Sequence, residues 1–399
     1  MPARGRVRAG LGARPGLRRR RARPAVTATF TARTARPVLT AEFVTDEAAF
    51  AALAPAWGRL FGKCSAATPF QSHAWLHSWW LSYGRPGQLR LLLVRAGGEL
   101  VAAAPLMLVS RPLPALVPLG GPISDYTDVL LDDTDDGRAA GTLTDALADA
   151  ACTALVDFRE VRPGGAVERV YDHWCGPRHK VRDSLCLELP GVPMDGLIAR
   201  LPSGKASQRA RAKLRRLTAL GVRRRTVGPE EAAAALGRLL ELHRLQWQGR
   251  KVTSEHLRRR FREHLMRAVP PMVRSGNAVV TEFLIGDEVL AVDLTLLSDS
   301  LAGGYLYGAH PGLRDRKADV AVMLLDACTE HTGGGRGTLS LLRGDESYKL
   351  HWRPERVVNQ RLLMARRRTA PLLAAALSGV AARQCGREVR HRWRERGLD

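Results

Sequence analysis

The fold of this chain is decided by the stretch VVTEFLIGDEVLAVDLTLL, residues 279–297, and by the sequence that follows it as far as Met364. Two apolar runs, 279–285 and 288–297, flank a Gly-Asp pair, and Asp or Asn next to Gly between apolar runs indicates a β-hairpin. A third apolar run, 301–307, follows a turn of Ser, Asp and Ser. The stretch therefore predicts three successive antiparallel strands.

A helix and two further strands are predicted beyond the loop 310–317. Apolar residues recur there at helical spacing and share one face: Val320, Met323, Leu324, Ala327 and Cys328. Three glycines at 333–335 suit the left-handed end of a helix. The runs 338–342 and 357–364 are typical of strands. This order of elements favours a mixed α/β sheet that binds a ligand where a strand meets a helix.

Between the last two runs lies the polar segment RGDESYKLHW, from Arg343 to Trp352. The pattern Arg-Gly-Asp-Glu-x-Tyr-Lys-x-x-Trp, placed after a helix and a short strand, resembles the signature of the BioF2-like (CelD-like) acetyltransferases. That family belongs to the GNAT superfamily and is related to the FemABX peptidyltransferases. The resemblance extends from about Val38 to Met364, and it implies an N-acyltransferase that uses acyl-CoA (acetyl-CoA) as co-substrate.

A short internal repeat links the two halves of the chain. GELVAA at 98–103 aligns with DEVLAV at 287–292, and in each half a Trp-bearing helix lies upstream. Two copies of one α/β unit explain this better than one long sheet. The resemblance likewise implies tandem GNAT-like (acyl-CoA N-acyltransferase) domains with mixed, mostly antiparallel sheets. With a boundary near Pro190, we predict an N-terminal domain at 38–190 and a C-terminal domain with basic helices at 191–364.

Basic residues are concentrated at the two ends of the chain. Its 399 residues carry a formal net charge of +23, with 62 Lys and Arg against 39 Asp and Glu. Residues 1–37 are rich in Arg and contain no acidic residue, and residues 365–399 are also Arg-rich. We predict a disordered or wrongly assigned leader at 1–37 and a basic C-terminal tail at 365–399. The charge therefore argues less for a nucleic-acid groove than its total suggests, although the tails provide a route to peripheral membrane contact.

Cysteine usage and hydropathy favour the cytoplasm. The six cysteines are scattered, with no Cys-x-x-Cys pair and no clustered histidines, which argues against a metal site or a disulfide framework. No apolar run reaches the roughly 18–20 residues that span a bilayer. We predict a cytoplasmic protein, peripheral to the inner face of the membrane where its basic tails bind lipid.

Several helix ends are predicted from local signals. Thr45 is a candidate N-cap for the first helix, and Ser203 for a very basic helix that follows it. A second basic helix, 255–269, is expected to end at the Pro-Pro pair 270–271. Another helix is predicted over 139–156. The two basic helices are interpreted as solvated faces, because almost no aromatic residue is interleaved with their charges.

The loop 314–319 stands where the GNAT superfamily usually holds the pyrophosphate of acyl-CoA. A helix N-terminus binds an anion through its unpaired N–H groups and its dipole. The loop lacks the Gly-rich sequence of ordinary GNATs, but Arg314, Arg316 and Lys317 are candidates for pairing with phosphate. The alternative is a solvated charged loop in which Asp315 is the N-cap of the next helix.

The signature supplies the candidate catalytic residues. Acyl transfer to an amine needs a base for the ammonium, a donor for the oxyanion and an acid for the leaving thiolate. Asp345 is the candidate for orienting or deprotonating the amine, Tyr348 for protonating sulfur, and Lys349 for holding a phosphate or carboxylate. The alternative is a structural corner in which Lys349 pairs with Glu346 and Trp352 lies in the core.

Further candidates lie outside the signature. Asp293 interrupts an apolar strand, where a carboxylate buried without a partner costs several kcal/mol, so it either lies at an exposed edge or has a catalytic function. Asp125 and Tyr126 resemble a Ser-Asp-Tyr loop of the family. With Trp352 they are predicted to contact the acceptor in a cleft between the domains, and the alternative for the loop is a simple turn.

The function implied by the resemblance is transfer of an acyl group from acyl-CoA to an amine on a small molecule, a glycan or a cell-envelope precursor, as in polysaccharide biosynthesis. No bound cofactor and no metal are expected. One rival is a FemABX-type transferase that uses aminoacyl-tRNA, the one case in which nucleic acid would be a partner. The other rival is a non-catalytic protein that binds membrane surfaces or nucleic acid through its basic tails.

Overall fold

The computed structural model describes residues 37–246, 254–333 and 335–382. Contacts divide the chain into Met1–Pro37 and Val38–Asp399, and the fold belongs to the second of these units. The predicted leader therefore lies outside the described residues except for Pro37, as does the predicted tail beyond residue 382. No helix in the described part of the chain is both long and apolar enough to cross a membrane.

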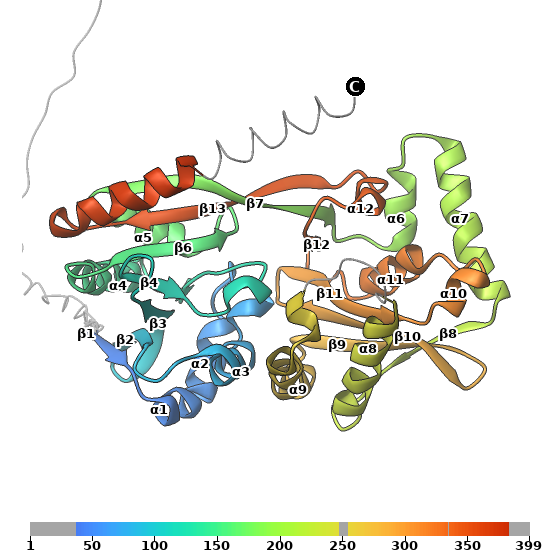
Figure 1. Cartoon of the computed structure of the whole chain (residues 1–399), viewed down its shortest axis with the longest axis horizontal. Helices are drawn as coiled ribbons and strands as arrows, with labels where there is room; N and C mark the ends of the chain where they lie inside the picture. Colours follow the sequence, from blue (N-terminus) through green and yellow to red (C-terminus); the bar gives the residue numbers. More distant parts are fainter. Residues whose placement is uncertain (1–36, 247–253, 334, 383–399) are drawn as a thin grey trace, which may run out of the picture. The chain divides into compact units, whose positions relative to one another are not determined.

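The described residues build one 13-stranded mixed sheet (Figure 1). The first half contributes β1 (Leu39–Val44), β2 (Leu89–Ala96), β3 (Glu99–Val109), β4 (Ala115–Pro118), β5 (Leu130–Leu131), β6 (Leu155–Val161) and β7 (Arg178–Pro190). The second half contributes β8 (Val222–Thr226), β9 (Ala278–Ile285), β10 (Glu288–Leu297), β11 (Leu301–Ala309), β12 (Thr338–Arg343) and β13 (Glu355–Met364). The predicted hairpin of β9 and β10, with its turn at Gly286 and Asp287, is confirmed.

The two halves of the sheet repeat one pattern of strand pairing, counted inwards from each edge. From one edge the order is β1, β2, β3, β4, β6, β13, and from the other it is β8, β9, β10, β11, β12, β7. Each series contains one parallel pair, β4 with β6 and β11 with β12, while the remaining pairs are antiparallel. This order confirms two copies of one α/β unit with mixed, mostly antiparallel strands.

The two copies exchange their last strands. β13 was predicted to close the second unit, but it lies between β6 and β7, while β7 pairs with β12 of the second half (Figure 1). Leu189 of β7 is buried in one cluster with Leu297 and Ala302, and Leu363 of β13 is buried in another with Ala115 and Leu155. The residue at which one domain ends and the next begins, predicted near Pro190, stays a prediction.

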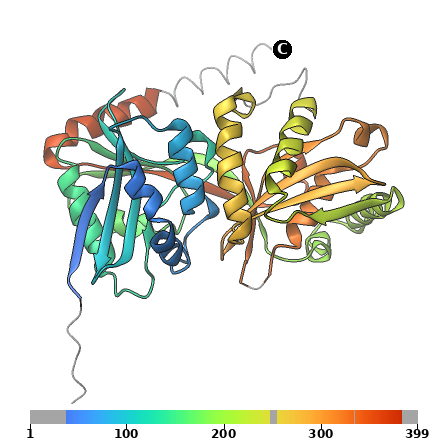
Figure 2. The same cartoon turned by 90° about the horizontal axis from the view of Figure 1, so that it is seen from below.

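Helices cover the sheet and connect its strands. They are α1 (Glu47–Ala52), α2 (Ala54–Phe61), α3 (His73–Tyr83), α4 (Arg138–Ala150), α5 (Val167–His173), α6 (Met194–Ala199), α7 (Gly204–Ala219), α8 (Ala232–Gln246), α9 (Arg259–Arg274), α10 (Gly312–Asp315), α11 (Val320–Thr329) and α12 (Ser347–Leu350). Figure 2 shows α3 and α9 side by side, and Ser78 Oγ of α3 donates to the backbone oxygen of His264 in α9 at 2.8 Å. The helices of the two repeats therefore contact each other directly.

Local signals predicted some helix ends and failed at others. Ser203 is the N-cap of α7, since its hydroxyl accepts from Ala206 N, as predicted. The first helix is capped by Asp46 rather than by Thr45. The prediction that the second basic helix ends at 270–271 is wrong, because α9 continues through both prolines. Met272, beyond them, is fully buried, so packing outweighs the backbone hydrogen bonds that the prolines cannot make.

Two segments differ from expectation because of their packing partners. The helix predicted over 139–156 ends at Ala150, and the chain enters the sheet as β6 at Leu155. The predicted basic tail is part of the fold over its first residues. Residues 370–382 are helical, and Leu373 and Ala376 are buried in one cluster with Leu155.

Candidate functional site

The central feature of the site is the point where β11 and β12 diverge. The two parallel strands pair over three positions only, where Leu301–Gly303 of β11 lie beside residues 338–340 of β12. Beyond this pairing a cavity of about 730 Å³ opens, lined by β11, α11, β12, α12 and residues of the loop 119–128 from the first half. The topology thus places residues from both repeats around one cavity.

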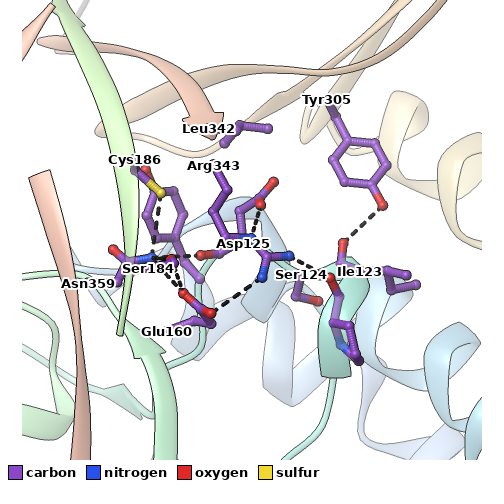
Figure 3. Close-up of polar contacts among 12 residues, drawn as sticks. Ile123, Ser124, Asp125, Glu160, Ser184, Cys186, Tyr305, Leu342, Arg343 and Asn359 are labelled. Atoms are coloured by element: carbon purple, nitrogen blue, oxygen red, sulfur yellow. Dashed lines mark hydrogen bonds and ion pairs between the residues drawn. The ribbon is translucent and has the colours of Figure 1, made fainter. Parts of the chain in front are cut away.

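A bulge in β11 fixes one wall of this cavity. The register between β10 and β11 shifts at Leu294 and Thr295, which leaves Tyr305 as the extra residue of β11. The Tyr305 hydroxyl donates to the backbone oxygen of Ile123 at 2.9 Å (Figure 3), and its ring packs edge-on against Trp75 with centroids 5.2 Å apart. The bulge therefore ties the second repeat to the loop 119–128.

The cavity lining includes a buried carboxyl group. Asp293 lies on β10, an interior strand, and is 3% exposed, which removes the alternative of an exposed edge. Its Oδ2 accepts from Thr295 Oγ1 at 2.7 Å and lies 3.9 Å from Cys328 Sγ. Burial raises the pKa of Asp293 to about 7, against which the hydrogen bonds from Thr295 and Cys328 act. The same burial, together with the charge of Asp293, raises the pKa of the Cys328 thiol above its usual range.

A second polar group crosses from β12 to the first repeat. Arg343 is ion-paired with Asp125, lies 3.3 Å from Glu160 Oε1, and donates to the backbone oxygen of Pro122 (Figure 3). Asn359 of β13 donates to Asp125 O and Glu160 Oε2, both at 3.1 Å. Asp125 and Arg343 line the cavity, so the prediction that Asp125 faces a site between the repeats fits this geometry.

Tyr126, the other predicted acceptor residue, is not among the described residues that line the cavity. It is 1% exposed, and its hydroxyl lies 2.9 Å from Ser340 Oγ and 3.2 Å from Glu188 Oε1. Glu188 in turn accepts two hydrogen bonds from Arg162, at 2.8 and 2.7 Å. Burial raises the pKa of Tyr126 far above its usual value. Tyr126 therefore braces the junction of β7 and β12, and its predicted contact with the acceptor stays a prediction.

The signature residues divide between the cavity and the surface. Lys349 lines the cavity, and its Nζ lies 2.8 Å from both the Arg343 backbone oxygen and Glu346 Oε2, the structural pairing considered above. Tyr348 lines the cavity at its outer rim, where it is 48% exposed, and burial of its hydroxyl end raises its pKa above the usual range. Trp352 is buried and also lines the cavity. Asp345 is exposed and is not among the described residues that line it.

The predicted phosphate loop lies outside the cavity. Arg314, Arg316 and Lys317 are all exposed, and none is among the described lining residues. The N-cap of α11 is Asp319, which accepts from Val322 N at 3.0 Å, so the alternative with Asp315 as N-cap is wrong.

Asp319 also pairs with a cation from a neighbouring helix. Its Oδ2 lies 2.7 Å from Lys213 Nζ of α7. A carboxylate at this helix end opposes an incoming phosphate, while the surrounding cations favour one.

Several groups that the fold brings together had no predicted role. Arg343 belongs to the quoted signature, but its partners Asp125 and Glu160 are 218 and 183 positions away. His243 and His256 also line the cavity, and burial lowers the pKa of both, which keeps them neutral near pH 7. In the part of the chain that the structure describes, no three His, Cys, Asp or Glu side chains are placed to hold a metal ion.

Comparisons with known proteins agree with this architecture. Residues 204–350 match the family model described as the acetyltransferase (GNAT) domain. The chain is similar to the crystal structure of FemX, with 12% identity over 84% of this chain and 99% of that one and a TM-score of 0.54. It is also similar to a conserved protein of unknown function from Bacteroides thetaiotaomicron, with 11% identity over 82% of this chain and 100% of that one and a TM-score of 0.54.

A third similar structure is the C-terminal domain of a putative lysylphosphatidylglycerol synthetase from Agrobacterium fabrum. It has 12% identity over 83% of this chain and 96% of that one, with a TM-score of 0.51. No curated protein matches the sequence. At such identities the solved structures show a shared fold alone, and with the strand order and the domain match they confirm a tandem GNAT-like architecture.

Proposed function

We propose, taking as premise that residues 204–350 form a GNAT-type acetyltransferase domain, that the protein transfers an acyl group from acyl-CoA to an amine in the cavity between β11 and β12. The observation that carries the proposal is the position of Asp293, a buried carboxyl with a pKa of about 7 in the lining of that cavity. A general base works best when its pKa lies near the operating pH, and an amine must lose a proton during acylation.

The donor would lie along the free edge of β11. Pairing of β11 with β12 ends at Gly303. From Tyr307 onwards α8 contacts this edge, since His243 Nδ1 lies 2.7 Å from the Tyr307 backbone oxygen. Between these points Gly304, Tyr305 and Leu306 line the cavity. A ligand with amide groups, such as the pantetheine arm of CoA, can bind such an edge as an added strand does.

The reaction needs two proton transfers. The amine nitrogen attacks the thioester carbon, the C–S bond breaks, and Asp293 accepts the proton that the nitrogen loses. Tyr348, an exposed residue of the cavity lining, supplies the proton that the departing thiolate takes, and it regains one from solvent. The remaining contribution is positioning of the two reactants within one cavity.

The polar residues around the rim and the loop have supporting roles in the proposal. Lys349 holds the turn after Arg343 in place and adds a positive charge beside the reacting thioester. Arg314, Arg316 and Lys317 would pair with the phosphates of CoA outside the cavity. Asp345 is exposed, so the proposal assigns it the orientation of the acceptor at the surface rather than the role of base.

The acceptor and the cellular setting belong to the proposal as well. Membership of the BioF2-like (CelD-like) family and a glycan or cell-envelope amine as acceptor follow from the resemblance of the 343–352 signature, and a cytoplasmic location follows from the scattered cysteines. A FemABX-type aminoacyl-tRNA donor is the second candidate. It is favoured by the outer face of α7, where Arg209, Arg211 and Arg215 are exposed and form no ion pair with any described residue.

Release of CoA from acetyl-CoA in the presence of amines tests the proposal. We expect kcat/KM to rise with pH up to about 7 as Asp293 ionises, and Asp293→Asn to lower it roughly 100-fold or more and flatten this limb. Asp287→Asn, in the exposed turn of the β9–β10 hairpin, is the matched control and should behave as wild type. Wild-type turnover in Asp293→Asn would show that another group is the base. Absence of an acylated product with any acyl-CoA would contradict the proposed function.

A further inference from the structure

We infer that the acceptor of this reaction is a primary alkylamine, whose ammonium group is carried on a slender apolar arm that reaches Asp293. The inference rests on the proposed function and specifies its substrate class. It differs from an amino-sugar acceptor, one of the classes that the sequence resemblance implies, because the two classes make opposite demands on the walls of the cavity.

Much of the lining of the cavity that holds Asp293 is apolar. Five of its lining residues are almost fully buried: Leu324, Leu325, Cys328, Leu339 and Trp352. A methylene arm can be buried against such side chains favourably. A sugar would bring several hydroxyl groups into the same space, where few partners could replace their hydrogen bonds to water.

Asp293 itself is built to receive a cation. Both of its recorded hydrogen bonds go to Oδ2, and no Lys or Arg in the described part of the chain forms an ion pair with it. Buried carboxylates in proteins are normally paired. An ammonium group at the end of an apolar arm supplies that missing charge and the hydrogen-bond donors together. It passes one proton to Asp293, which leaves the neutral amine that attacks the thioester carbon, and the nitrogen loses its second proton to solvent as the amide forms.

Other lining residues have the opposite character. The ion pairs of Asp125 with Arg343 and of Glu346 with Lys349 also line the cavity, and Glu346 and Tyr348 are exposed, which marks its side towards solvent. A polar head group can be solvated or hydrogen-bonded at this level. The cavity therefore sorts a ligand by length, with its polar part at the rim and its amine inside.

Titration calorimetry on the whole chain tests the inference independently of turnover. The probes are n-hexylamine, 1-hexanol as its uncharged counterpart, and glucosamine, each with CoA present. We expect hexylamine to bind at least about tenfold more tightly than either of the others. Asp293→Asn should remove the preference for hexylamine over hexanol, while Asp287→Asn should keep it.

The outcomes separate the inference from the function on which it rests. Binding or acylation of glucosamine in preference to hexylamine overturns the alkylamine class and leaves acyl transfer standing. Binding of hexylamine that depends on Asp293, with no transfer from any acyl-CoA, keeps the amine site and removes the function. If Asp293→Asn fails to fold, the hexylamine-to-hexanol ratio of the wild-type chain decides alone, and a ratio near one overturns the inference.

Discussion

Arg343, the last residue of β12, forms an ion pair with Asp125, which lies 218 positions earlier on the loop before β5. The pair joins the two repeats at the wall of the cavity, and Glu160 Oε1 lies 3.3 Å from the same guanidinium. The side chains are 27% and 12% exposed, so water screens the pair only in part. One arginine thus neutralises carboxylates from two segments of the other repeat.

Replacement of Arg343 should destabilise the whole fold. Arg343→Met leaves Asp125 and Glu160 largely buried without their cation, which is expected to cost on the order of 2–4 kcal/mol in the free energy of unfolding. Chemical denaturation measures this loss. Arg259→Met is the control, because the Arg259–Glu263 pair is 91% and 40% exposed and should change stability by less than about 1 kcal/mol. Equal stability of both variants would show that the cluster contributes no net free energy.

The stability of the protein should fall as the pH rises towards neutral because of Asp293. Its pKa is raised to about 7 in the fold, above its value in the unfolded chain, so the folded state binds the extra proton between these values. The favourable contribution is complete below the unfolded pKa and is lost as pH rises through about 7. Asp293→Asn should therefore gain stability relative to wild type from pH 5 to pH 8, by on the order of 2–4 kcal/mol.

Asp128 is a second carboxyl group whose pKa is raised, and it is present in both the wild type and Asp293→Asn. Burial raises its pKa to about 7, although it accepts hydrogen bonds from the backbone of Val129, Ala166 and Val167. Comparing wild type with Asp293→Asn at each pH cancels its contribution. A difference that does not change with pH would mean that Asp293 is ionised in the fold throughout.

Tyr348→Phe should lower kcat and leave KM nearly unchanged. The phenol is the proposed source of the proton for the leaving thiolate, and general acids contribute roughly 100- to 10,000-fold to such steps. Tyr171→Phe is the control, since that ring lies against Arg178 and Lys180 and outside the cavity. The loss of activity in Tyr348→Phe should be smaller with an acyl donor whose thiol is a better leaving group. A wild-type kcat would exclude Tyr348 as the acid.

The start of the C-terminal segment should be needed for stability. Leu373 is 7% exposed in a cluster with Leu155 and Leu363, and Thr369 Oγ1 donates to the Ala151 backbone oxygen at 2.8 Å. A chain ending at residue 364 should lose about 2–4 kcal/mol of unfolding free energy through exposure of this cluster. A chain ending at residue 382 keeps these contacts. Equal thermal midpoints for the two chains would contradict the packing described here.

Much of the local structure could be predicted from the sequence. The Gly-Asp turn between apolar runs predicted the β9–β10 hairpin, helical spacing predicted α11, and Ser203 marked the start of α7. In each case the deciding interactions join residues only a few positions apart. Local signals failed where packing competes with them, as at the prolines of α9, whose neighbours are held in the core.

Only the tertiary structure decided which segments meet. The sequence placed Asp293 on an apolar strand and put Arg343 in a signature, but neither the exchange of β7 with β13 nor the pairing of Arg343 with Asp125 leaves a trace in local spacing. Tyr126 was predicted as a site residue from the same motif as Asp125, but its side chain lies in the core. Asp345 was predicted from the same motif as Tyr348, but it is exposed to solvent outside the cavity lining. The reason is physical: a strand's partner and a side chain's burial depend on apolar surface and charge brought from distant parts of the chain, whereas hydrophobic periodicity records only which face of its own element a residue occupies.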